Sequence, residues 1–294
     1  MNYITNILIL LLEVLKWLVL ARVLLSWLPM AGARISPYNP VIQFLTRVTD
    51  PILRPLRPFS RMGTMDFSPI IAFFIIGFVQ KILGGMPISQ LVALAISLTI
   101  AFSVHEFSHA WVAYKSGDST AKNQGRLTMN PLKHLDVLGT IMVLAVGFGW
   151  AKPVPVNPYA LRSGPKAGMA TVAVAGPLSN LALAILAAIP LRLGVIESTS
   201  IFSSGLLDFF IPTMPQLFFT FIWLNVILLV FNLLPIAPLD GFKVLLGFLP
   251  YPASEAFRKS EPFGPLILLL LVFLPTGLTT LLSSITNWIV GILI

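Results

Sequence analysis

The chain has 294 residues, of which 56% are hydrophobic and 10% are charged, and its mean hydropathy is +0.90. This composition excludes an ordinary soluble enzyme and indicates a bilayer protein, with room for about six or seven helices of the ~20 residues that cross a membrane. The net charge of +8 does not indicate a nucleic-acid partner, because the basic residues lie between apolar runs, as in cytoplasmic loops. With no cysteine, disulfides and thiolate metal sites are excluded.

Residues 1–85 form one predicted unit of two apolar helices joined by a basic loop. The first run, 4–28, has no small-residue cleavage site after it and is expected to remain as a helix. The loop 29–66 carries five arginines against two aspartates, which places it in the cytoplasm by the positive-inside rule. Within this loop, residues 39–59 predict an amphipathic interfacial segment broken by prolines. The second helix is expected at about 68–83.

Three stretches of this first unit carry a resemblance: ARVLLSWLPM at 21–30, NPVIQFLTRVTDPILRPLRPF at 39–59, and DFSPIIAFF from Asp66. Together they resemble the YggT family of small two-helix membrane proteins. That family has no clear biochemical activity to transfer. The resemblance therefore implies a membrane anchor or helper for the rest of the chain.

The next apolar run, 88–114, contains the sequence HEFSH. On a helix, His105 and His109 share a face, so two imidazoles could hold one Zn²⁺ while Glu106 acts on a bound water. The alternative is a pair of histidines that only form hydrogen bonds within the helix bundle. Ionisable groups at membrane depth are costly and usually functional, which favours the zinc interpretation.

Further apolar runs are expected to span at 168–191 and 217–234, and two last runs, 263–274 and 278–294, to form a hairpin. The run 137–148 is too short to span and has basic flanks on both sides, so it is expected to be re-entrant. The basic charge of the loop 115–136 places that loop in the cytoplasm by the positive-inside rule. The loop 192–216 is the least basic and is expected on the outside. The unusual polar residues then fall at one depth, towards the cytoplasmic face.

A catalytic zinc normally has three protein ligands, so a third is needed. Asp240 follows an apolar helix and is one candidate, although it could instead cap a short helix from Gly241. His134 is the other candidate, but it lies in a charged loop, where a histidine is more often solvated. Asn180 and Asn232 are available to stabilise an oxyanion, and hydrogen bonding between helices is an equal alternative for each.

The segment 149–159, GWAKPVPVNPY, is a candidate β-like strand that pairs with an extended substrate beside the active site. Pro153 and Pro155 lack amide donors, so pairing is limited to one side. A proline-rich interfacial loop without substrate contact is the alternative.

Five stretches in order, HEFSHAWVAY, GRLTMNPLKHLDVLGT, GWAKPVPVNP, AGPLSN and FNLLPIAPLDG, look like the site-2 protease family of intramembrane zinc metalloproteases, in its compact bacterial form without a PDZ domain. The resemblance covers about residues 88–250. It implies one zinc held by His105, His109 and Asp240, with Glu106 as catalytic acid and base. The YggT-like front end departs from that pattern and leaves substrate entry and partners open.

The sequence thus predicts an all-α polytopic membrane protein with an anchor at 1–85 and a protease domain at 86–294. The expected activity is zinc-dependent hydrolysis of transmembrane segments of other proteins, in a bacterial inner membrane with the active site towards the cytoplasm. A non-catalytic scaffold with a structural metal site is the alternative, but an intact Glu106 disfavours it. A metal transporter is also disfavoured, because the sequence shows no internal repeat and the site lies off centre.

Overall fold

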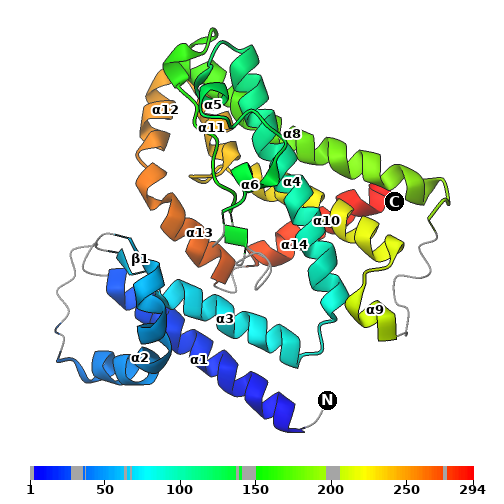
Figure 1. Ribbon diagram of the computed structural model, residues 1–294. Helices are drawn as coiled ribbons and strands as arrows, with labels where there is room; N and C mark the ends of the chain where they lie inside the picture. The colour runs from blue at the N-terminus through cyan, green and yellow to red at the C-terminus, as the bar shows by residue number, and fades with distance from the viewer. Residues whose placement is uncertain are drawn as a thin grey trace. The chain divides into compact units, whose positions relative to one another are not determined.

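The computed structural model describes residues 3–27, 36, 38–62, 65–66, 68–136, 139–140, 150–196, 206–273 and 277–294 (Figure 1). Contacts within the chain divide it into two units, residues 1–87 with 137–150 and residues 88–136 with 151–294. Helices make up most of the described part of both units. The predicted re-entrant run, 137–148, lies outside the described residues except for 139–140 and stays a prediction.

Within residues 1–87 of the first unit, the described part of the chain forms the helices α1 (Tyr3–Trp27), α2 (Pro40–Ser60) and α3 (Ser68–Leu83). The strands β1 (Arg61–Met62) and β2 (Met65–Asp66) pair antiparallel between α2 and α3, with Arg61 opposite Asp66. One buried apolar cluster joins the three helices, and it comprises Val19, Leu53, Ala72 and Ile76. The two predicted apolar helices are therefore confirmed, within one residue of their expected bounds.

The helix α2 corrects one prediction. Residues 39–59 were expected to be broken by prolines, but α2 runs through Pro51, Pro55 and Pro58 as one helix. All three prolines are exposed and, at spacings of four and three residues, share one side of the helix. The opposite side packs against α1 and α3, and this packing stabilises the helix despite the missing amide donors.

The second unit contains most of the chain's helices and two short 3₁₀ turns. In order, they are α4 (Ile88–Lys115), α5 (Thr120–Asn123), α6 (Pro131–His134), η2 (Pro158–Ala160), α8 (Gly164–Arg192), α9 (Leu206–Phe210), α10 (Met214–Asn232), α11 (Asp240–Phe248), α12 (Tyr251–Arg258), η4 (Glu261–Phe263), α13 (Gly264–Phe273) and α14 (Leu278–Leu293). The helix α8 packs against α4, α10 and α11, and α4 also packs against α10 (Figure 1). This arrangement brings α4 and α11 to the same helix, α8.

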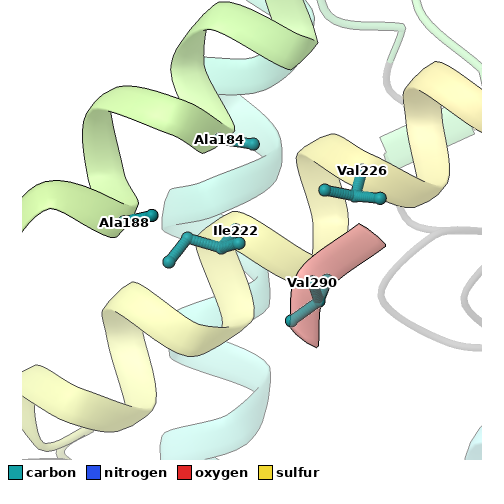
Figure 2. Packing of buried hydrophobic residues seen from close by; sticks show 5 residues of the cluster. All are labelled: Ala184, Ala188, Ile222, Val226 and Val290. Carbon is teal, nitrogen blue, oxygen red and sulfur yellow. The ribbon is translucent and has the colours of Figure 1, made fainter. Parts of the chain in front are cut away.

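Close packing of these helices depends on small side chains. Figure 2 shows Ala184 and Ala188 of α8 beside Ile222 and Val226 of α10, with Val290 of α14 completing the cluster. Without a hydrophobic driving force in lipid, small residues allow helices to approach closely and gain van der Waals contact.

Three described helical stretches are long and apolar enough to cross a membrane: Ile88–Lys115, Gly164–Arg192 and Leu207–Asn232. All three lie in the second unit; the first two are close to the expected bounds, whereas the third begins ten residues before the expected start at 217 and takes in part of the expected loop 192–216. They establish the chain as a membrane protein.

The segment 151–157, which follows the short helix α6 by way of residues 135–150, is extended. A single antiparallel bridge joins Leu135 to Ala151, and the Lys152 amide donates to the His134 carbonyl at 2.7 Å. The segment forms no longer strand within the described residues, so its β-like pairing with a substrate stays a prediction.

Candidate metal centre

Two imidazoles and one carboxylate meet between α4 and α11. The Nε2 atoms of His105 and His109, one turn apart on α4, lie 3.1 Å from each other. The Oδ2 atom of Asp240 lies 3.2 Å from Nε2 of His105 and 3.1 Å from Nε2 of His109. All three side chains are buried. The three donor atoms therefore form a nearly equilateral triangle.

Asp240 is aimed at the histidines by the first turn of α11. The alternative prediction, that Asp240 caps a helix starting at Gly241, is wrong, because α11 already includes Asp240 and Leu239 occupies the N-cap. Gly241 lies so close to the backbone of Leu233 and Leu234 that a Cβ would overlap their atoms. Glycine at this position thus allows α11 to start directly beside the end of α10.

The other ring nitrogens fix the orientation of both imidazoles. Nδ1 of His105 donates to Oδ1 of Asn180 at 2.6 Å, and Nδ1 of His109 donates to the Val172 carbonyl at 2.8 Å. Asn180 in turn donates to Oδ1 of Asn225 at 2.8 Å. Because both Nδ1 atoms carry the proton, both Nε2 lone pairs point into the triangle, as metal binding requires.

The residues present fit a zinc ion. Tetrahedral zinc with bonds of ~2.0–2.1 Å places its ligand atoms roughly 3.3–3.4 Å apart, close to the observed separations. Gly176 of α8 supplies the space, since a Cβ there would overlap Nε2 of both histidines. Two histidines and one carboxylate also leave the fourth position open, as in catalytic zinc sites.

A second carboxylate stands beside this triangle. Glu106 follows His105 on α4, is buried, and accepts a hydrogen bond at 3.0 Å from the Val154 amide. Its other oxygen is the one available for a proton-transfer role. The carboxylate is thus held by the extended segment 151–157.

The segment 151–157 is itself held by three further hydrogen bonds. The Lys152 carbonyl accepts from Nη2 of Arg126 at 2.6 Å, and the Lys152 amide donates to the His134 carbonyl. At the other end, the Asn157 amide donates to Oδ2 of Asp118 at 2.7 Å. Asp118 is only 1% exposed. Burial alone would raise the pKa of Asp118, but its hydrogen bonds with Thr120 and Asn157 outweigh that and hold the pKa below its usual range.

Replacing Asp118 with asparagine should lower the cleavage rate about tenfold while leaving zinc content unchanged. The NH₂ group of the asparagine would face the backbone N–H of Thr120 or of Asn157, so one of these two hydrogen bonds would be lost. Losing it should cost ~1–3 kcal/mol. The Val154 amide would then hold Glu106 less firmly. Single-turnover cleavage and zinc content measure the two effects, with Glu255→Gln, at a half-exposed carboxylate, as control. A wild-type rate in Asp118→Asn would contradict this positioning role.

The structure places the other predicted polar residues as follows. Asn180 contacts His105, whereas Nδ2 of Asn232 donates to the Leu228 carbonyl at 3.0 Å within its own helix. His134 is not a member of the described metal cluster and is not solvated, because it is fully buried and bonds the Thr128 carbonyl. Asn225 was missed by sequence reasoning, although an asparagine within an apolar span is a recognisable signal.

A buried candidate metal centre of two histidines and one carboxylate, with a second carboxylate beside it and apolar helices around it, is typical of a membrane-embedded metallohydrolase. The particular family follows from comparison with known proteins. Residues 93–273 match peptidase family M50, and residues 1–87 match the CCB3/YggT family. The chain therefore belongs to peptidase family M50, and its front end is similar to the CCB3/YggT family.

Individual relatives of the chain are similar to the same two parts of it. Over 195 residues, 65% of this chain and 84% of the relative, the chain is 43% identical to "Putative zinc metalloprotease YwhC" of Bacillus subtilis. It is 31% identical to "Putative zinc metalloprotease Rip2" of Mycolicibacterium smegmatis over 60% of this chain and 64% of the relative. The first 87 residues resemble "Uncharacterized protein YggT" of Escherichia coli, at 32% identity over 83 residues, 28% of this chain and 42% of the relative. No solved structure matches the chain.

The resemblance to site-2 proteases is thereby confirmed, and with it zinc as the cofactor and a membrane metalloprotease as the class of enzyme.

Proposed function

We propose that this protein is an intramembrane zinc endopeptidase that cuts other membrane proteins within or near their transmembrane segments. The observation that carries the proposal is the convergence of His105, His109 and Asp240 on one point, with Glu106 beside them, in a unit of membrane-length helices. A soluble substrate would not require a site surrounded by apolar helices. A transmembrane helix of another protein would require such a site, because it reaches the enzyme within the bilayer.

Each residue has a distinct part in the proposed reaction. Zinc, when bound, supplies a Lewis acid and a water whose pKa is lowered to about 7. His105, His109 and Asp240 hold the metal, and Asn180 and the Val172 carbonyl keep the two rings turned towards it. Glu106 accepts a proton as general base and returns it to the leaving amide nitrogen as general acid.

Asn180 and Asn232 were predicted as stabilisers of the oxyanion. Both polar atoms of the Asn180 amide are engaged, by His105 and by Asn225, so its geometry favours orienting the imidazole. Asn232 donates within its own helix and would have to exchange that bond to reach a substrate. Asn232 is therefore the better candidate to stabilise the oxyanion, and Asn180 is the better candidate to orient the imidazole of His105.

The extended segment 151–157 is the proposed substrate edge. The Val154 amide already donates to Glu106 and the Lys152 amide to His134, while Pro153 and Pro155 have no amide hydrogen. An unwound substrate would therefore pair by donating to carbonyls of this segment.

The topology that suits this function has about six or seven crossings, in a bacterial inner membrane, with the metal centre towards the cytoplasm. Residues 1–85 serve as a membrane anchor and residues 86–294 as the protease domain. The basic loop 115–136 directly after α4 supports the orientation. A non-catalytic scaffold is the less favoured alternative, because a structural zinc site is normally closed by four ligands and needs no base such as Glu106.

Removing zinc should abolish cleavage reversibly. The full chain, reconstituted in liposomes with a panel of single-span membrane proteins, is expected to lose activity with a zinc chelator and regain it with Zn²⁺ but not Mg²⁺, because nitrogen ligands favour zinc. Mass spectrometry of the products should place the cut within or next to the apolar span. Cleavage that persists after complete zinc removal, or that is confined to the soluble flanks, would contradict the proposal.

A further inference from the structure

The helix α2 has two unlike sides. Its inner side is apolar, with Leu53 fully buried against Val19 of α1 and Ala72 of α3. Its outer side is exposed and is called here the α2 outer face, comprising Val41, Phe44, Arg47, Pro51, Arg54 and Pro55. The side chains of Val41 and Phe44 are 61% and 57% exposed, respectively. Within the described part of the first unit, the α2 outer face is therefore exposed and accessible to a partner.

The charges on and beside this face are predominantly positive. Asp50 is the only acidic residue of α2, and its carboxylate is shared by Arg22 at 2.7 Å, Arg57 at 3.0 Å and Arg54 at 3.2 Å. One negative charge thus faces three guanidinium groups. The Arg54 side chain is 73% exposed, and Arg47 is exposed as well. The cluster has an excess of positive charge that an anion would neutralise.

The prolines add an independent constraint. Pro51, Pro55 and Pro58 cannot donate to the carbonyls four residues earlier, those of Arg47, Pro51 and Arg54. An unsatisfied carbonyl in hydrocarbon costs several kcal/mol, so the part of this side that carries these three carbonyls does not lie among acyl chains. Water and lipid headgroups do supply donors. The outer face therefore belongs at the level of the headgroups, where basic side chains meet lipid phosphates.

We propose that the α2 outer face binds anionic phospholipid headgroups. Arg47 and Arg54 contact the phosphates, and Val41 and Phe44 enter the boundary of the acyl chains, as in interfacial helices. Charge complementarity identifies the occupant, because the exposed charges on the face are arginines. This site is independent of the metal centre and gives the front end of the chain a function of its own, as a lipid-selective anchor.

The test compares lipid binding by the full chain in neutral detergent, with phosphatidylglycerol or phosphatidylcholine added and bound lipid counted by native mass spectrometry. Wild type should prefer phosphatidylglycerol. Each arginine near an anionic surface contributes about fivefold, so the double variant Arg47→Gln with Arg54→Gln should lose roughly 25-fold of that preference. The matched control is Arg258→Gln with Lys259→Gln, which removes the same charge from an exposed part of α12 and its C-terminal end.

The control should keep the preference of the wild type. Equal binding of the two lipids by wild type would overturn the proposal, as would an equal loss in both double variants. Retention of the preference in the Arg47 and Arg54 variant would also overturn it, because the anionic lipid would then bind elsewhere on the chain. Because proteolysis is not measured, failure of this proposal is distinguishable from failure of the proposed function.

Discussion

Replacing Gly176 with alanine should remove zinc and activity together, although it adds one carbon atom. A Cβ at this position would overlap Nε2 of both His105 and His109, the atoms that face the proposed metal. The histidines cannot retreat freely, because Asn180 and the Val172 carbonyl hold their opposite nitrogens. We expect zinc content to fall from about one per chain to less than a tenth, with cleavage undetectable.

The matched control is Gly291→Ala in α14, where a Cβ would meet nothing within 4 Å. That variant should keep wild-type zinc and activity and should be slightly more stable, because alanine favours a helix over glycine by ~1 kcal/mol. Elemental analysis and thermal unfolding of both variants separate metal loss from misfolding. A Gly176→Ala protein with full zinc content would show that α8 does not approach the metal as described.

Replacing Glu106 with glutamine should lower the cleavage rate by about 10²–10⁴-fold, the range for loss of a general acid–base group. Glutamine has nearly the same shape, and its carbonyl oxygen can still accept from the Val154 amide, so the segment 151–157 should stay in place. Zinc should be retained, because Glu106 is outside the triangle of donor atoms. The control is Glu255→Gln in α12, whose side chain is 45% exposed and which should cleave at the wild-type rate. A Glu106→Gln enzyme with undiminished activity would exclude a proton-transfer role for this residue.

The candidate metal cluster of His105, His109 and Asp240 was predictable from the sequence. His105 and His109 are one helical turn apart, which fixes their common face, and ionisable residues are rare in apolar runs. Asp240 was harder, because aspartate at a helix start is also a common N-cap residue. In the structure α11 begins at Asp240 and Leu239 occupies the N-cap, which disfavours the cap and leaves Asp240 as a proposed metal ligand.

The supports of the site were less predictable, because they depend on contacts between distant segments. The bond from Asn180 to Asn225 joins residues 45 positions apart, and the bond from Val154 to Glu106 joins residues 48 apart. Neither separation leaves a periodic pattern in the sequence. The role of Gly176 likewise depends on the approach of α8 to α4, which sequence alone does not specify.

The prolines of α2 show how tertiary packing overrides local propensity. Pro51, Pro55 and Pro58 each remove a helical hydrogen bond, and on that ground a broken segment was expected. The helix persists because its apolar side packs against α1 and α3, while all three prolines lie on the exposed side. A helical projection of the prolines, made beside that of the apolar residues, would have revealed this separation.

The most direct test of the central claim is to measure zinc content and cleavage in the same preparations of wild type and Glu106→Gln, reconstituted in liposomes with single-span substrates. The structure predicts about one zinc per chain in both proteins and cleavage by wild type alone, because the three donor atoms are unchanged while the base is lost. Purified wild type that binds no zinc would contradict the account at its foundation. Equal cleavage by the two proteins would contradict the role assigned to Glu106.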